Sequence, residues 1–161
     1  MGWPIISIVS GGFDPIHIGH IRLLKEARDC GTELWVILNN DNWITAKKGF
    51  IFMPEQERKE ILESIKYVSH VFLTEHEPQP TDMSVCTALE KFAPYYINEL
   101  GFTLRFCNGG DRKEDNVPEY TVCEKLGIEL IFGIGGEKIQ SSTELARKVA
   151  SSNRVVLEVK K

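Results

Sequence analysis

The sequence has no apolar stretch near the roughly 20 residues that a membrane-spanning helix needs, and it has no block of like charges. Its first residues, MGWPII, lack the charged segment and the apolar segment of a secretory leader. The 161 residues carry a formal net charge of −4, which excludes the basic surface of a general nucleic-acid binder. We therefore expect a cytoplasmic protein with no membrane or nucleic-acid partner.

Cysteine is also scarce, and Cys30, Cys86, Cys107 and Cys123 include no CxxC pair. This spacing argues against a zinc ribbon or a redox pair, so we expect reduced, mostly buried thiols. With 42% hydrophobic residues, the chain can bury one well-packed core and is short for two domains. We predict a single domain over residues 1–161, with a tail at about 152–161 that could add an edge strand or pack on a partner.

Five short apolar runs alternate with amphipathic segments. Continuous runs of branched residues are typical of strands buried on both faces of a parallel sheet. We predict a Rossmann-like, doubly wound α/β domain of five parallel strands with helices on both faces, whose ligand site lies at the carboxyl ends of the strands. The predicted strands are residues 5–10, 33–39, 70–73, 103–108 and 128–132, and the predicted helices are 19–30, 54–67, 83–92, 118–126 and 142–151.

The loop after the first run, SGGFDPIHIGH, is not the GxGxxG dinucleotide fingerprint. Gly11 and Gly12 can turn the chain sharply. His17 and His20 then enter a helix three residues apart, so their side chains would point nearly the same way. Gly19 would leave room for a phosphate at the helix amino terminus, where N–H groups favour anions. The alternative is a tight turn with one histidine in the core and the other on the surface.

The same loop resembles the signature of the HxGH nucleotidyltransferases, the cytidylyltransferase-like superfamily, through Phe13, Asp14, His17, Gly19 and His20. This family transfers a nucleotidyl group from a nucleoside triphosphate to a phosphate-bearing acceptor and releases pyrophosphate. The resemblance covers about residues 5–148, and within the family the chain is similar to glycerol-3-phosphate cytidylyltransferase and the heptose-phosphate adenylyltransferase domain. Class I aminoacyl-tRNA synthetases share HIGH but need a far longer chain and a KMSKS-like loop, so we exclude them.

Cations follow the second predicted strand. Its loop ends in Lys47 and Lys48, and Arg58 lies near the start of the next helix. The resemblance implies that a lysine here neutralises the triphosphate as a point charge and that Arg58 binds phosphate oxygens in a fork. The alternative is a solvated basic loop, with Arg58 in a helix-surface ion pair with Glu55 or Glu57.

Glycine and hydroxyl residues follow the last two predicted strands. The resemblance places Gly110 and Asp111 of NGGDR, with less weight on Arg112, near the ribose or base. The alternative is a glycine-rich turn that Asp111 caps. In KIQSSTELARK, the hydroxyls of residues 141–143 and the helix start would cradle the β- and γ-phosphates. Ser141 and Glu144 also fit a capping box, and the two roles can coexist.

Departures from the family pattern leave alternatives open. Cytidylyltransferases have an arginine and a glycine where this chain has Gly136 and Ile139, with Lys138 as a substitute charge, so CTP and ATP both remain possible. The missing arginine, together with Lys66 where relatives often have arginine, motivates a second function, a non-catalytic nucleotide sensor. A third hypothesis, an assembly-only structural protein, fits poorly with glycine and cation loops at the strand ends.

We predict an enzyme that transfers CMP or AMP from CTP or ATP to a phosphorylated sugar, polyol or alcohol. Mg²⁺ and a homodimer are implied by the resemblance, and Asp14 would either orient the first loop or help to hold the Mg²⁺ ion. Acceptor contacts are expected in TEHEPQPTDM and APYYINELGF, where His76, Tyr95 and Tyr96 have no obvious family role and could shape a pocket or a dimer face. The alternative is that the aromatic residues there belong to the core. The predicted catalytic residues are His17, His20, Lys47 and Arg58, and the predicted nucleotide-binding residues are Gly11, Gly12, Phe13, Asp14, Gly19, Gly110, Asp111, Ser141, Ser142 and Thr143.

Overall fold

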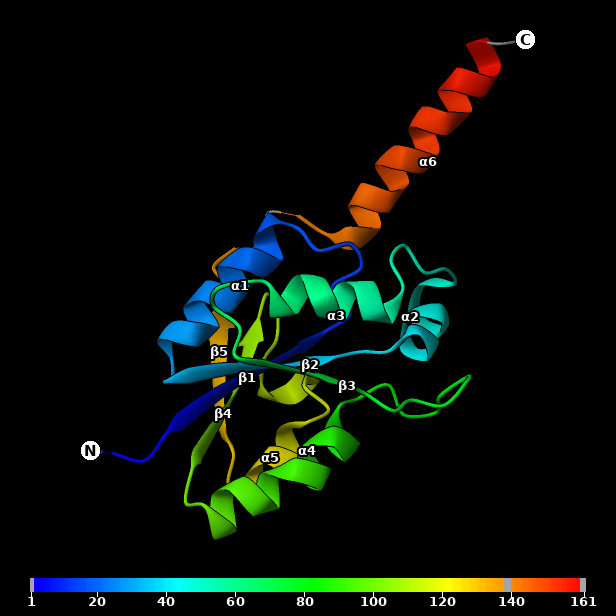
Figure 1. The fold of residues 1–161 in the computed structure, drawn as a ribbon. Helices are drawn as coiled ribbons and strands as arrows, with labels where there is room; N and C mark the ends of the chain where they lie inside the picture. The colour runs from blue at the N-terminus through cyan, green and yellow to red at the C-terminus, as the bar shows by residue number, and fades with distance from the viewer. Residues whose placement is uncertain (1, 138–139, 160–161) are drawn as a thin grey trace.

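A computed structural model describes residues 2–137 and 140–159, with side chains as far as residue 151 in the last helix. Five parallel strands form one sheet in the order β3-β2-β1-β4-β5 (Figure 1). The strand order reverses between β1 and β4, so the predicted doubly wound, Rossmann-like sheet is confirmed. The strands are β1 (Ile5–Gly11), β2 (Glu33–Leu38), β3 (His70–Leu73), β4 (Thr103–Gly109) and β5 (Glu129–Ile134).

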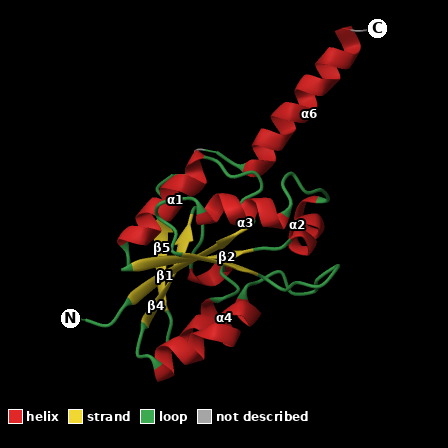
Figure 2. Ribbon diagram, viewed as in Figure 1, coloured by secondary structure: helices red, strands yellow, loops and turns green. Residues whose placement is uncertain are grey.

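Helices cover both faces of the sheet, as Figure 2 shows. They are α1 (Ile18–Asp29), α2 (Asp41–Lys48), α3 (Glu55–Glu63), α4 (Cys86–Pro94), α5 (Tyr120–Leu126) and α6 (Ser142–Val159), with a π-helical turn at Tyr95–Glu99 and a 3₁₀ turn at Glu114–Asn116. Across residues 2–137 and 140–159, no helix is both long enough and apolar enough to cross a membrane.

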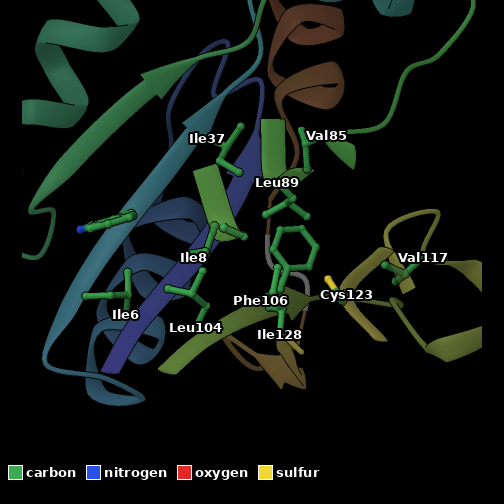
Figure 3. Close-up of a cluster of buried hydrophobic side chains, with 12 residues drawn as sticks. Ile6, Ile8, Ile37, Val85, Leu89, Leu104, Phe106, Val117, Cys123 and Ile128 are labelled. Atoms are coloured by element: carbon green, nitrogen blue, oxygen red, sulfur yellow. The ribbon is translucent and has the colours of Figure 1, made fainter. Parts of the chain in front are cut away.

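Successive side chains of a strand point to opposite faces of the sheet, so each strand contributes to two separate cores. Ile8 belongs to the core under α4 and α5, which Figure 3 shows, whereas its neighbour Val9 belongs to the core under α1 and α3. Leu89 closes the first core and Leu24 the second, and all four side chains are fully buried. Because both faces of the sheet are covered, the groups available to a ligand lie at the ends of the strands.

The helix pattern departs most from the prediction at α2 and α6; in addition, α3 ends at Glu63 rather than at residue 67, and α4 begins at Cys86 rather than at residue 83. Residues 41–48, expected as loop, form α2, because the Asn40 side chain accepts the Trp43 N–H at 3.0 Å and Gly49, with φ of +82°, ends the helix. This helix is too short to show a clear apolar period. The segment expected as a tail after residue 151 continues α6 to Val159, and Figure 1 shows α6 projecting away from the sheet.

Candidate active site

The loop between β1 and α1 is anchored by a buried aspartate. Asp14 is only 2% exposed, and its two carboxylate oxygens accept the backbone N–H groups of Phe52 at 2.8 Å and Met53 at 2.6 Å. Its carbonyl oxygen accepts a bond from the Lys48 ammonium at 2.6 Å. The first loop is therefore tied to the segment between α2 and α3, which lies about forty positions later in the sequence.

His17 and His20 together cap the amino terminus of α1. His17 Nδ1 accepts the Gly19 N–H at 3.1 Å, and His20 Nδ1 accepts the His17 N–H at 3.2 Å. The two rings stack with centroids 3.8 Å apart, and Phe13 packs edge-on against His20 at 4.8 Å. Because each Nδ1 is an acceptor, each ring in its neutral form carries its proton on Nε2. The cap thus sets both the tautomer and the parallel orientation of the pair.

The pKa of His20 is lowered from 6.5 to about 3, chiefly by burial and in addition by the neighbouring His17 and Lys48. The ring is therefore neutral throughout the physiological range. A neutral imidazole with an Nε2–H can donate a hydrogen bond to an anion, whereas a pKa of about 3 makes His20 a poor proton acceptor at neutral pH.

A cavity of about 630 Å³ lies at the switch point, between the ends of β1, β4 and β5 and the starts of α1 and α6. The structure brings most of the predicted residues together here: Gly11, Phe13, His17, Gly19, His20, Gly110, Asp111, Ser141 and Ser142 line the cavity. Arg112 and Gly136 line it as well. The predicted residues outside this lining are Gly12, Asp14, Lys47, Arg58 and Thr143.

Glycines that we did not predict shape the far wall of this cavity. A Cβ on Gly109 would lie 2.8 Å from the Ile134 carbonyl oxygen, and a Cβ on Gly135 would lie 3.2 Å from Leu23 Cα. Gly135 also has a φ of +86°, which favours glycine. A signal for them was present in the sequence, because each of these glycines is the first of a Gly-Gly pair at the end of a strand. Buried Asn108, at the end of β4, also lines the cavity and carried no such signal.

The start of α6 combines capping with a contact to the first loop. Ser141 Oγ accepts the Glu144 N–H at 3.1 Å, as expected for a helix cap, while Ser142 Oγ donates to the Pro15 carbonyl at 2.8 Å. Asp111 makes no side-chain hydrogen bond within residues 2–137 and 140–159, so the alternative of a turn capped by its carboxylate is not found there. Its carbonyl instead accepts the Asn116 side-chain amide at 3.0 Å. Lys138 and Ile139 lie outside the described residues.

Arg58 is buried rather than exposed, with 1% of its surface accessible. Its guanidinium donates to the carbonyls of Met53 at 2.9 Å, Gly12 at 2.7 Å and Asn39 at 2.7 Å, and to the Asp41 carboxylate at 2.7 Å. The alternative of a surface pair with Glu55 or Glu57 is therefore wrong. Because these bonds use four of the five N–H groups, a phosphate fork would have to displace some of them.

Lys47 and Lys48 lie in the last turn of α2 rather than in a loop. Lys47 Nζ lies 5.7 Å from the centroid of the Trp43 ring, whereas Lys48 Nζ contacts the Asp14 carbonyl. Burial lowers the pKa of Lys48, and Arg58 and Lys47 add to this while Asp14 opposes it. The structure thus separates two adjacent lysines, of which Lys48 braces the first loop.

The described residues do not offer a dedicated magnesium site. Both oxygens of Asp14 accept backbone N–H groups, and no cluster of three His, Cys, Asp or Glu side chains suits a metal within residues 2–137 and 140–159. The expected role of Asp14 as a metal ligand does not fit this geometry, because the carboxylate is already used to anchor the loop. An Mg²⁺ ion carried by the triphosphate itself stays a prediction.

Comparisons with known proteins show the family to which the chain belongs. A family model described as cytidylyltransferase-like matches residues 8–157. The chain is 41% identical over 69 residues to an FAD synthase of Pyrococcus abyssi, with 42% of this chain and 47% of the relative covered. It is 37% identical over 118 residues to an FAD synthase of Methanoregula boonei, with 71% and 74% covered. The chain spans about half the length of the first curated relatives that it matches.

Among solved structures, a lipopolysaccharide core biosynthesis protein from Thermoplasma volcanium matches with a TM-score of 0.60 and 24% identity. The match covers 86% of this chain and 98% of that chain, and at this identity it shows the fold alone. The family model spans nearly the whole chain, and its range includes the histidine pair and the start of α6. The chain therefore belongs to the cytidylyltransferase-like family.

Proposed function

We propose that this chain is an adenylyltransferase that transfers AMP from ATP to the phosphate of FMN, forming FAD and pyrophosphate. The observation that carries the proposal is the stacked pair of His17 and His20 on the wall of the 630 Å³ cavity, at the amino terminus of α1. The relatives named FAD synthase support ATP as the donor and a flavin phosphate as the acceptor. Gly136, where cytidylyltransferases carry an arginine, is consistent with ATP.

In the proposed reaction, an oxygen of the acceptor phosphate attacks the α-phosphorus of ATP. The bond from that phosphorus to the oxygen bridging to the β-phosphate breaks, and pyrophosphate leaves. No general base is required, because a phosphate monoester is already ionised at neutral pH. The Nε2–H groups of His17 and His20 would donate to the α- and β-phosphate oxygens, where charge develops in the transition state.

Other predicted residues take supporting roles in this proposal. The start of α6, with Ser141 and Ser142, would hold the β- and γ-phosphates, and Asp111 would accept hydrogen bonds from the ribose hydroxyls. Lys47 would reach the triphosphate as a point charge from the end of α2. Arg58 would act as a positioning residue, because its guanidinium donates a hydrogen bond to the Gly12 carbonyl in the first loop. We further propose a homodimer and a cytoplasmic location, the latter supported by the four free thiols.

The test is a pyrophosphate-release assay on the purified protein, with ATP and CTP supplied separately. Each nucleotide is paired with FMN, glycerol 3-phosphate or a sugar phosphate, and products are separated by chromatography. The proposal expects FAD and pyrophosphate from ATP with FMN. Turnover with a sugar phosphate but not with FMN would refute FMN as the acceptor, and a preference for CTP would refute ATP as the donor. Binding of ATP without turnover on any acceptor would instead support a nucleotide sensor.

A further inference from the structure

A second cavity of about 490 Å³ lies between the end of β3 and the start of α4. Its size is within the range of about 300–1,000 Å³ that is usual for small-molecule sites. It shares no lining residue with the first cavity. Residues at the end of β3, in the loop 74–85 and on α4 form its walls, and none of them has a role in the phosphate chemistry proposed above.

The floor of this second cavity is aromatic. Phe72 and Phe92 stack with centroids 5.7 Å apart and an interplanar angle of 17°, and both are partly exposed. They form the open edge of a larger cluster, since Trp35 lies 5.5 Å from Phe72 and 6.0 Å from Phe92. Ala88 on α4 also lines the cavity, and its small side chain takes up little of the space. A planar ring that enters here would extend an existing stack and bury its faces against apolar atoms.

The walls carry hydroxyl groups that could contact the edge of such a ring. Thr81 and Thr87 line the cavity, and neither side chain makes a hydrogen bond within the described part of the chain. His76, by contrast, is fully used: its Nδ1 contacts Thr74 Oγ1 at 2.8 Å, and its Nε2 donates to the Ser84 carbonyl at 3.0 Å. His76 therefore holds the wall in place, while the two threonines are available to a ligand.

The charge at the mouth of this cavity disfavours a phosphate. Glu75, Glu77 and Asp82 line it and are exposed. The cation among the lining residues, Lys91, is already paired with both carboxylate oxygens of Glu75 at 3.0 Å. A phosphorylated acceptor would therefore place its uncharged end here and leave its phosphate elsewhere.

The second cavity is linked to the active-site loop through α2. Trp43 donates its indole N–H to the Met83 carbonyl at 2.8 Å, and the same ring lies 3.2 Å from where a Cβ on Gly12 would be. The side chains of Asn40 and Asn42 both donate to the His76 carbonyl. Since β3 is two strands from β1, and neighbouring strands are about 4.8 Å apart, the carboxyl ends of these two strands lie roughly 10 Å from each other along the sheet edge. An extended polyol chain spans that distance.

We infer that this second cavity holds the isoalloxazine ring of the flavin acceptor, with the ribityl chain crossing the carboxyl edge of the sheet toward His17 and His20. The inference rests on the proposed function, because it requires a flavin phosphate as the acceptor. Stacking on Phe72 and Phe92 supplies affinity, and the hydroxyls of Thr81 and Thr87 select a ring with hydrogen-bonding edges. The acidic mouth sets the direction in which the acceptor binds.

The test compares variants on the same helix. Ala88→Leu fills the floor, and Thr87→Val removes a hydroxyl while keeping the shape of the side chain. Glu90→Leu is the matched control, because Glu90 is exposed on α4 and lies outside the cavity lining. Thermal unfolding confirms that each variant is folded. FAD formation gives separate KM values for FMN and ATP, and riboflavin fluorescence gives binding of the flavin without its phosphate.

We expect Ala88→Leu to raise the KM for FMN and the Kd for riboflavin by about tenfold or more, which corresponds to about 1.4 kcal/mol, with the KM for ATP unchanged. Thr87→Val should weaken both about threefold to tenfold, and Glu90→Leu neither. Intact FAD formation with an unchanged KM for FMN in both cavity variants would overturn this inference and leave the proposed function standing. If the wild-type protein makes no FAD, the proposed function fails, and riboflavin binding then tests the second cavity as a site for the flavin ring. Riboflavin binding that is lost in Ala88→Leu would support a flavin-ring site in this cavity. No riboflavin binding to the wild-type protein would overturn it.

Discussion

The neutral His20 predicts a specific loss of stability in acid. With a pKa of about 3 in the folded protein and 6.5 in the unfolded chain, the unfolded chain binds more protons between these values. Stability therefore rises with pH across this window and falls as the pH is lowered below 6.5. Between pH 7.5 and pH 4.5 the His20 contribution amounts to about 2.5 kcal/mol, at about 1.4 kcal/mol per unit of pKa difference.

The variant His20→Asn isolates this contribution. An asparagine oxygen can replace His20 Nδ1 as the acceptor of the His17 N–H, so the cap is kept and the titrating group is removed. Urea unfolding of both proteins at pH 7.5 provides the baseline, and the same measurement at pH 4.5 provides the effect. We expect the wild-type protein to lose about 2.5 kcal/mol more than the variant over this range.

Two results would refute this reasoning. The first is a stability difference between the two proteins that is the same at pH 4.5 and pH 7.5. The second is an NMR titration of the His20 ring with a midpoint near that of a solvated imidazole. Either result would mean that the ring can be charged in the folded state, and His20 would then be a candidate for proton transfer rather than a fixed donor.

Three further substitutions test other parts of the site. His17→Ala should lower kcat about 100-fold or more through the loss of one transition-state donor, and turnover close to wild type in the folded variant would contradict its catalytic role. Asp14→Asn leaves the backbone N–H of Phe52 or Met53 without its acceptor and should cost about 1–3 kcal/mol in chemical unfolding; an unchanged midpoint would show that the anchor is dispensable. Gly109→Ala places a Cβ 2.8 Å from the Ile134 carbonyl and should raise the KM for ATP about tenfold, whereas Gly2→Ala, which meets no atom within 4 Å, should not.

The fold was largely predictable from the sequence because its determinants are local. Each apolar run of branched residues became a strand of the parallel sheet, with the largest change at β5, which runs from Glu129 to Ile134 rather than from residue 128 to residue 132. The first loop was predictable as well, since its glycines and histidines needed only to follow a strand. The α2 helix was missed because Asn40 acts as a cap, and asparagine is equally common in loops.

The environment of single side chains was harder to predict, because it depends on contacts between distant segments. Nothing local distinguishes a surface arginine from Arg58, whose partners Gly12 and Asn39 come from two other loops. The second cavity was equally hidden, since Phe72 and Phe92 are twenty positions apart and are both ordinary core residues by type. His76 was expected near the acceptor, and the structure places it in the wall of that cavity.

The hydrogen bonds of Arg58 are confined to one side of the carboxyl edge of the sheet, the side of β1 and β2. Arg58 joins the segments after β1, after β2 and before α3, and Asp14 joins the first to the third, so hydrogen bonds hold these three segments to one another. On the opposite side, Gly110, Gly135 and Gly136 all have positive φ, and a Cβ on Gly110 or Gly136 would meet no atom within 4 Å. If the proposed nucleotide requires the site to adjust, we expect the change at these glycines rather than in the three segments that Arg58 and Asp14 hold together.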